Sequence, residues 1–142
     1  MHKIVVEEGA EPVKHKLSGV PFSVRSDLET ELNRMCTEGI TEPTESSLWL
    51  SPLVVARNRD GKLRVCVNLR SLNKAIWIDS APLPKVEDLF AKTVGAKFFS
   101  KLDLASAYHQ VELDPKSRHY TSFVSPLGTF QFRRMPFGLA LR

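Results

Sequence analysis

Two apolar runs separated by a turn signal constrain the fold more than any other feature of this chain. Residues 53–57 are rich in β-branched side chains, and apolar and polar residues alternate strictly over residues 63–69. A period of two places successive side chains on opposite faces of a strand. Asp60 and Gly61 lie between the runs, and such a pair tolerates the positive φ that hairpin turns require. The sequence therefore predicts a β-hairpin, and with it an antiparallel sheet.

The predicted hairpin carries several basic side chains. Arg57, Arg59 and Lys62 flank the turn, and Arg64 lies on the polar face of the second strand. The guanidinium group is planar and donates paired hydrogen bonds that match a phosphate group. Two interpretations fit these residues about equally: contact with phosphate groups, or a solvated hairpin tip.

An amphipathic helix is predicted before the hairpin, over residues 26–38. Ser26 and Glu29 have the spacing of a capping box, in which each side chain bonds to the backbone amide of the other residue. Gly39 is suited to end the helix. The apolar residues recur at helical spacing and are expected to face the core: Leu28, Leu32, Met35 and Cys36.

The remaining elements are less clearly marked. Residues 1–25 have little periodicity and several Gly and Pro residues, so we expect an extended arm whose order depends on packing. Pro84 suits the first position of a second helix. Residues 120–124 and 129–132 are predicted to form two strands joined by a turn.

Residues 97–113 carry a candidate metal ligand. Phe98, Leu102 and Leu104 share one parity, which predicts a strand with one buried face. Asp103 then lies near the end of this strand, on the opposite face. A carboxylate at such a position can hold a metal ion at the floor of a cleft. The plainer interpretation is that Asp103 caps the turn that follows.

Composition limits the class of protein without identifying it. The chain has 142 residues, 42% hydrophobic, which is enough for one domain or part of a larger one. A net charge of +4 fits a nucleic-acid partner but does not demonstrate one. Cys36 and Cys66 are far apart and have no metal-ligand spacing, so we expect reduced thiols in an intracellular protein, without distinguishing cytoplasm from nucleus. No apolar run approaches the length of a membrane span, and we expect no membrane partner.

Several collinear segments resemble one family. Residues 101–104, Lys-Leu-Asp-Leu, followed by Ser-Ala-Tyr-His-Gln at 106–110, resemble the first catalytic motif of reverse transcriptases, in the form found in the Pol polyproteins of gypsy-type LTR retrotransposons. Further segments resemble that family in the same order: residues 51–55, 59–61, 64–74, 82–89, 120–123, 128–132 and 135–139. Any one segment is modest support, whereas the ordered series is strong.

The resemblance implies a fold of the α+β class. It would contain the fingers and a partial palm of a right-hand polymerase, with antiparallel strands and two or three helices. Residues 1–25 would be an extended N-terminal arm. Residues 26–96 would be a fingers-like region with the basic hairpin, and residues 97–142 the start of a truncated palm.

The resemblance also implies a chemistry, which is templated addition of nucleotides to a primer end by two divalent ions. Mg²⁺, or Mn²⁺ in its place, is held by hard oxygen ligands such as carboxylates. Asp103 would be the first catalytic, metal-binding aspartate, and the carbonyl of Leu104 would add an oxygen. The partners of the full-length parent would be an RNA or DNA template-primer and deoxynucleotides.

The nucleotide-binding residues follow from the same resemblance. Arg64 would lie across the incoming nucleotide and its phosphates, and either Arg57 or Arg59 would reach the triphosphate. Tyr108 would lie under the sugar and exclude a 2′-hydroxyl group. Phe137 and Gly138 would line the nucleotide or template side of the pocket.

The sequence departs from the family pattern in two places. Asn68 and Leu69 stand where the family usually has Asp and an aromatic residue, which predicts weaker support of the hairpin. The family continues the Met-Pro-Phe-Gly-Leu segment with Asn-Ala-Pro and, later, a Tyr-x-Asp-Asp hairpin that carries further metal-binding aspartates. Here Leu139 is followed by Ala-Leu-Arg, and no two Asp residues are adjacent. We therefore expect a fragment of an RNA-directed DNA polymerase that is inactive alone.

Two alternatives remain open at this point. The chain could be a non-catalytic, retroelement-derived module that binds nucleic acid or protein. It could also be a marginally folded product whose uncovered palm strands allow self-association.

Overall fold

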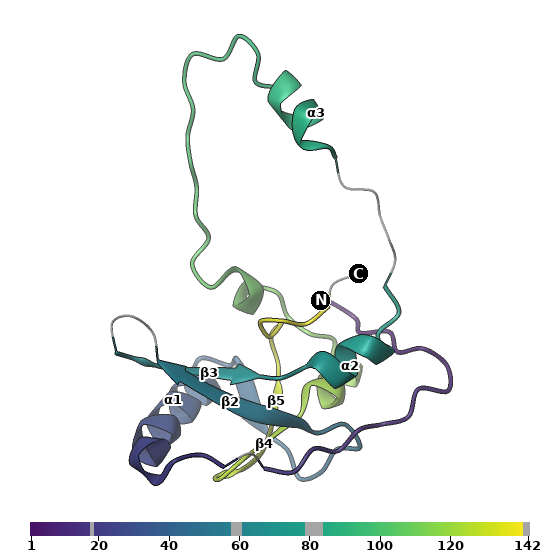
Figure 1. The fold of residues 1–142 in the computed structure, drawn as a ribbon, viewed down its shortest axis with the longest axis vertical. Coiled ribbons are helices and arrows are strands. Elements are labelled where there is room, and N and C mark those ends of the chain that lie inside the picture. The colour runs from purple at the N-terminus through teal and green to yellow at the C-terminus, as the bar shows by residue number, and fades with distance from the viewer. Residues whose placement is uncertain (18, 58–60, 79–83, 141–142) are drawn as a thin grey trace.

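A five-stranded sheet forms the body of the chain. The computed structural model describes residues 1–17, 19–57, 61–78 and 84–140 (Figure 1). Within them the strand order is β1-β5-β4-β2-β3. The strands are β1 (Thr41–Pro43), β2 (Ser51–Arg57), β3 (Leu63–Val67), β4 (Phe123–Ser125) and β5 (Gly128–Phe132). The pairing is antiparallel as predicted, except that β2 and β4 are parallel, because two separate hairpins meet side by side there.

The predicted hairpin is confirmed. β2 pairs with β3 from Leu53↔Val67 to Arg57↔Leu63. Leu53 and Val67 are buried, whereas Arg64 is exposed, as the alternation predicts. Leu69, one of the two departures from the family pattern, is also buried in the core.

The predicted amphipathic helix is α1 (Arg25–Thr37), and it buries Leu28, Leu32 and Met35 as expected. The predicted capping box is wrong. A 3-10 turn, η1 (Phe22–Val24), leads directly into α1, so Val24 is the N-cap and Ser26 lies inside the helix. The Ser26 carbonyl accepts a hydrogen bond from the Thr30 hydroxyl. No helix in the described part of the chain is long and apolar enough to cross a membrane.

The N-terminal arm is extended and is fastened to the body by short β-bridges. His2 pairs with Leu113, Val6 with Ile76, and Lys14 with Leu50. Ile4 and Val20 are buried in the core. The arm is thus ordered by packing against residues far away in the sequence, including Ile76 just beyond the short helix α2 (Arg70–Ala75).

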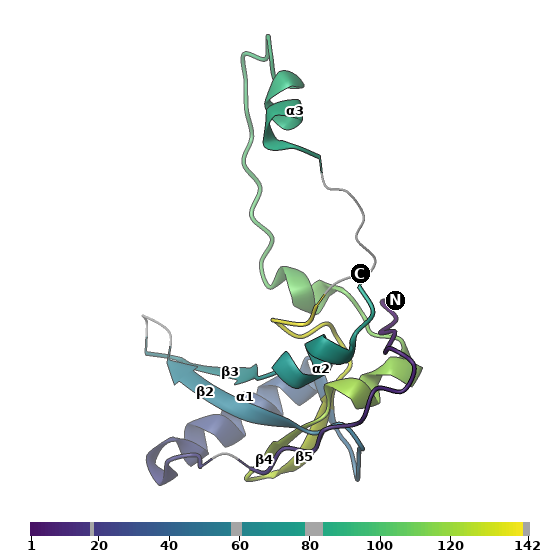
Figure 2. The same cartoon turned by 45° about the vertical axis from the view of Figure 1, so that its right-hand side comes forward.

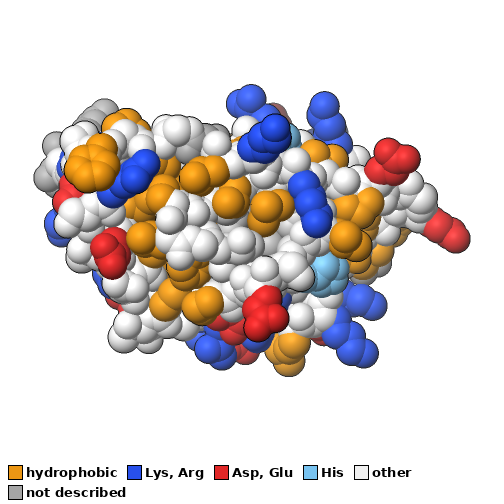
Figure 3. All heavy atoms as spheres, turned by 90° about the horizontal axis from the view of Figure 1, so that it is seen from below, with side chains coloured by type: hydrophobic (Ala, Val, Ile, Leu, Met, Phe, Trp, Pro, Cys, Tyr) orange, Lys and Arg blue, Asp and Glu red, His pale blue; other side chains and the backbone are white. Residues whose placement is uncertain are grey.

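A long excursion over residues 84–106 stands away from the body (Figures 1 and 2). It carries α3 (Val86–Ala91), whose N-cap is Lys85, so Pro84 precedes the helix instead of occupying its first position. All described residues from 84 to 106 are exposed. The underside of the body, by contrast, shows hydrophobic side chains mostly in small groups among polar ones (Figure 3).

The predicted strand over residues 98–104 is not formed. These residues have no regular structure, and Phe98 and Leu102 are 94% and 90% exposed. A strand needs a neighbour to receive its backbone hydrogen bonds and to cover its apolar face. Among the described residues, no strand pairs with this segment, and its period-two pattern has nothing to pack against.

The C-terminal part returns to the body. The 3-10 helices η2 (Ala107–Gln110) and η3 (Pro115–Thr121) precede the β4–β5 hairpin. The strand predicted over residues 120–124 begins only at Phe123. Asp114 accepts a hydrogen bond from the Lys116 amide, and Pro115 occupies the first turn, so the chain stays helical through Thr121.

Candidate functional site

Three side chains expected to contact a nucleotide converge from separate segments. Arg64 comes from β3, Tyr108 from η2 and Phe137 from the loop after β5. The ring centroids of Tyr108 and Phe137 lie 5.1 Å apart. Arg64 Cζ lies 5.2 Å from the centroid of the Phe137 ring, which is within cation–π distance. All three are at least one-third exposed, so the cluster offers a guanidinium group and two aromatic rings to solvent.

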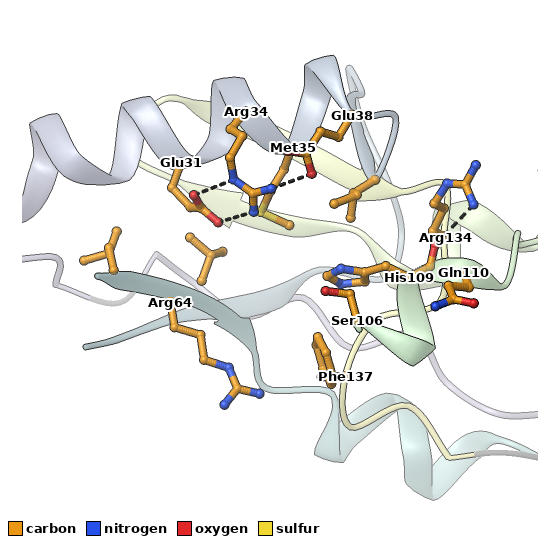
Figure 4. A pocket seen from close by; sticks show the side chains of 13 residues that line it. Glu31, Arg34, Met35, Glu38, Arg64, Ser106, His109, Gln110, Arg134 and Phe137 are labelled. Carbon is orange, nitrogen blue, oxygen red and sulfur yellow. Dashed lines mark hydrogen bonds and ion pairs between the residues drawn. The ribbon is translucent and has the colours of Figure 1, made fainter. Parts of the chain in front are cut away.

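An open pocket of about 490 Å³ borders this cluster, between α1, β3 and η2 (Figure 4). Charged side chains of α1 point into it from one side, and His109 and Phe137 face them from the other. Its lining is mixed, with polar groups and an apolar wall: Glu31, Arg34, Met35, Glu38, Ile40, Leu63, Arg64, Val65, Ser106, His109, Gln110, Arg134 and Phe137.

Arg34 is held by its own helix. Its Nε and Nη2 donate to Glu31 at 2.9 and 2.6 Å, and Nη1 donates to Glu38. The hydrogen bonds to Glu31 and Glu38 raise the pKa of Arg34, so the guanidinium stays charged. These pairs have the spacing of neighbours on one helix face. Arg34 therefore shapes the pocket with its donors already engaged.

His109 packs against Phe137 and lines the pocket beside the cluster. Its ring lies edge-on to Phe137, with centroids 4.9 Å apart. Arg134 Nη1 donates to the His109 carbonyl at 3.2 Å. Burial lowers the pKa of His109, and the positive charges of Arg34 and Arg134 lower it further, whereas Glu38 and Glu31 oppose the shift. The imidazole is therefore neutral at neutral pH.

This depressed pKa predicts a pH-dependent stability. Because the unfolded chain takes up the His109 proton at a higher pH than the folded chain, the free energy of unfolding should fall as pH drops below about 6.5 and level off below the folded pKa. Urea denaturation of the wild type and of His109→Gln from pH 5 to pH 8 measures the effect. A difference between the two proteins that is constant with pH would contradict a lowered pKa of His109.

Arg57 lies on the other face of the hairpin from Arg64. It pairs across the strands with Leu63, and cross-strand partners share a face, whereas Arg64 is the next residue along. Arg57 Nη2 donates to Asp27 of α1 at 2.9 Å, and Nη1 donates to the Gly61 carbonyl at 2.9 Å. The structure thus does not bring Arg57 into the cluster around Phe137. Arg59 lies outside the described residues.

Gly138 follows Phe137 and has a φ of +81°, in the left-handed region that favours glycine. Its carbonyl accepts a hydrogen bond from Asn73 of α2 at 2.7 Å. Gly138 thus lies beside the cluster, in the turn that presents the Phe137 ring, and contributes backbone to it.

Asp103 and Leu104 are both exposed and lie between α3 and η2, on none of the three segments that form the cluster. Within residues 1–17, 19–57, 61–78 and 84–140, no group of three or more His, Cys, Asp or Glu is placed to hold a metal ion. Asp103 therefore belongs to no such group among these residues.

Comparison with known proteins decides the family. The family described as "Reverse transcriptase (RNA-dependent DNA polymerase)" matches residues 56–141, which is more than half of the chain. The chain belongs to the reverse transcriptase family.

Related reverse transcriptase sequences occur in long retrotransposon polyproteins. The chain is 37% identical over 136 residues to the "Retrovirus-related Pol polyprotein from transposon 412" of Drosophila melanogaster, covering 92% of this chain and 11% of that protein. It is 32% identical over 114 residues to the "Transposon Tf2-7 polyprotein" of Schizosaccharomyces pombe, covering 80% of this chain and 8% of that protein. The chain thus spans about a tenth of the length of these relatives.

Solved structures confirm the expected fold. Prototype Foamy Virus protease-reverse transcriptase (CSH mutant) matches with a TM-score of 0.78 at 21% identity, covering 95% of this chain and 18% of that one. A foamy viral protease-reverse transcriptase in complex with double-stranded DNA matches with a TM-score of 0.70 at 17% identity, covering 94% of this chain and 22% of that one. The α+β class and the reverse transcriptase fold predicted from sequence are therefore correct.

Sequence reasoning missed several residues of the site. His109 and Asn73 lie inside segments that resemble the family, but nothing in their spacing assigns a partner. The pattern over residues 26–38 predicts only a core-packing face for α1. The regular spacing of Glu31, Arg34 and Glu38 was the available signal for a charged second face.

Proposed function

We propose that this chain supplies the nucleotide-contacting and template-contacting surface of an RNA-directed DNA polymerase. The observation that carries the proposal is the convergence of Arg64, Tyr108 and Phe137 from three separate segments. Membership of the reverse transcriptase family supports an incoming deoxynucleotide as the proposed ligand of this cluster. In this proposal residues 26–96 are the fingers-like region and residues 97–142 the start of the palm.

The three side chains offer complementary chemistry. The guanidinium group of Arg64 suits a triphosphate, because it is permanently charged and donates in a planar fork. The rings of Tyr108 and Phe137 offer apolar planes to the sugar and base. In this arrangement Tyr108 lies against the sugar and discriminates against a 2′-hydroxyl group. Arg57 and Arg59 remain candidates for contact with phosphate groups at the hairpin.

Nucleic acid is the proposed macromolecular partner. The net charge of +4 and the basic hairpin favour a polyanion. The related foamy viral enzyme, which shares the fold, is solved in complex with double-stranded DNA. We therefore propose that an RNA or DNA template-primer lies across the hairpin and the adjoining cluster.

Mg²⁺, or Mn²⁺, is the divalent ion we propose for the complete enzyme, with the Asp103 carboxylate and the Leu104 carbonyl as the ligands from this chain. Both are hard oxygen donors of the kind these ions prefer. Because Asp103 belongs to no group of three or more candidate metal ligands among the described residues, we assign neither tight metal binding nor polymerisation to this chain alone.

Binding of a deoxynucleotide by the chain tests the proposal. We expect dATP to shift the nuclear magnetic resonance signals of Tyr108 and Phe137, and Arg64→Ala to weaken binding about tenfold, because a hydrogen bond to a charged group contributes roughly 1.5 kcal/mol or more. Arg70→Ala is the matched control, since Arg70 is also exposed and follows the same hairpin. Equal affinities of the wild type and Arg64→Ala would contradict the assignment.

A non-catalytic binding module is the second candidate function. The basic hairpin favours such a module, because basic side chains can bind a polyanion without a metal site. If the chain binds a template-primer duplex but does not bind dATP at Arg64 and Phe137, this second function is favoured over the first.

A further inference from the structure

Asn73 holds the loop that carries Phe137. Its Nδ2 donates to the Gly138 carbonyl at 2.7 Å, and its Oδ1 accepts from the Ala140 amide at 2.9 Å. The two partners are 65 and 67 positions away in the sequence. A side-chain amide has a donor end and an acceptor end, and here both are bonded to the backbone of one short loop. The contact is therefore a two-point clamp.

The clamp acts on the exposed part of an irregular segment. Pro136 and Leu139 are buried, whereas Phe137 and Gly138 form an exposed turn between them. At the entry to this segment, the Met135 amide donates to the Val111 carbonyl at 2.8 Å. At the exit, Asn73 bonds on both sides of Leu139. The turn that presents the Phe137 ring is thus fastened at both ends.

The clamp also links two parts of the cluster through one continuous piece of chain. Arg64 lies on β3, which ends at Val67, and Asn73 lies on α2, which begins at Arg70. Leu72, next to Asn73, is fully buried, so α2 is anchored in the core. The segment from β3 to α2 therefore carries Arg64 and, through Asn73, also forms hydrogen bonds to the loop that carries Phe137.

From this geometry we propose that Asn73 is a positioning residue, which sets where the Phe137 ring lies against Arg64 and Tyr108 and thereby tunes nucleotide affinity. The proposal rests on the proposed function only in naming a nucleotide as the ligand of the cluster. Asn73 need not touch the nucleotide, because it acts through the loop backbone.

Two substitutions separate the ends of the clamp. Asn73→Ala removes both hydrogen bonds. Asn73→Asp is isosteric and keeps an acceptor for the Ala140 amide, but an ionised carboxylate cannot donate and instead opposes the Gly138 carbonyl. A protonated carboxyl group can donate and accept, so Asn73→Asp should recover toward the wild type as pH falls toward the carboxyl pKa. Asn33→Ala and Asn33→Asp on the exposed face of α1 are the matched controls.

The experiment reads the ring position and the nucleotide affinity separately, on the full chain. Ring-current shifts of the Tyr108 and His109 protons report the place of the Phe137 ring, which lies 5.1 and 4.9 Å from theirs. Titration with dATP reports affinity, and urea denaturation checks that each variant is folded. We expect both Asn73 variants to change the shifts and to weaken dATP binding by up to about tenfold at pH 7.5, because the free energy of the one or two hydrogen bonds removed limits how strongly the loop can affect affinity.

The outcomes separate the two proposals. Unchanged ring-current shifts in folded Asn73 variants would overturn the clamp, and changed shifts with unchanged dATP affinity would overturn its effect on the nucleotide. If the wild type binds no dATP, the proposed function fails, and the clamp is judged by the shifts alone. Recovery of the shifts of Asn73→Asp at pH 4.5, measured relative to the wild type, would support the clamp in either case.

Discussion

Alanine in place of Arg57, Arg59, Lys62 and Arg64 together is expected to lower the affinity of the chain for an RNA–DNA duplex by about a hundredfold or more at moderate salt. The reason is electrostatic, because each neutralised phosphate releases counterions and contributes about 0.9 to the slope of log affinity against log salt. The slope should therefore become shallower by roughly two to four in the variant. Fluorescence anisotropy of a labelled duplex between 50 and 300 mM salt measures both quantities.

A charge-matched variant controls for the loss of net charge. Lys3, Lys14 and Lys16 on the N-terminal arm and Lys116 on η3 are all exposed, and none of them belongs to the β2–β3 hairpin. Changing these four lysines to Ala removes the same charge. Equal losses of affinity in the two variants would mean that net charge, and not the hairpin, determines binding.

The two arginines described in the hairpin should not contribute equally. Arg57 is paired with Asp27, and both side chains are about half exposed. To bind a phosphate group, Arg57 would have to leave the Asp27 carboxylate, so the net gain in binding free energy is small. Arg64 instead lies over the Phe137 ring, on the face of the hairpin where the nucleotide cluster forms. Arg64→Ala should therefore reduce duplex affinity and nucleotide affinity together, whereas Arg57→Ala should lower duplex affinity only slightly and leave nucleotide affinity unchanged.

Local patterns predicted those elements whose partners are close in the sequence. The β2–β3 hairpin and α1 follow from alternation, turn chemistry and helical spacing, because each pattern is completed within a few residues. Residues 98–104 carry an equally regular pattern and form no strand. The difference is that a strand is stabilised by its neighbours, and no described strand pairs with residues 98–104.

The same reasoning explains which site residues were found. Resemblance to the family indicated Arg64, Tyr108 and Phe137, and the fold brings these three together. The resemblance assigned no role to Asn73 or His109. Asn73 bonds to the backbone of residues 138 and 140, and the His109 ring packs edge-on against the Phe137 ring. Such contacts depend on the path of a loop after β5, which no periodicity in the sequence encodes.

Phe123→Ala is expected to destabilise the chain by about 3–5 kcal/mol, the range for removing a buried aromatic side chain. Phe123 is completely buried, and its ring lies 5.9 Å from that of Phe130 and 5.3 Å from that of Phe132. The substitution would leave a cavity where β4 pairs with both β2 and β5. Because small domains are typically stable by only 5–15 kcal/mol, much of the folded state could be lost. Urea denaturation followed by circular dichroism measures the change.

Phe98→Ala is the matched comparison, because it deletes the same side chain from a residue that is 94% exposed. A side chain in that environment loses almost no packing on truncation, so the change should stay within about 0.5 kcal/mol. The pair of variants therefore tests the correction to the sequence interpretation, since a strand over residues 98–104 would place Phe98 on a buried face. If Phe98→Ala instead costs several kcal/mol, the segment is packed in solution, and Asp103 at its end is held by a sheet rather than by an exposed loop.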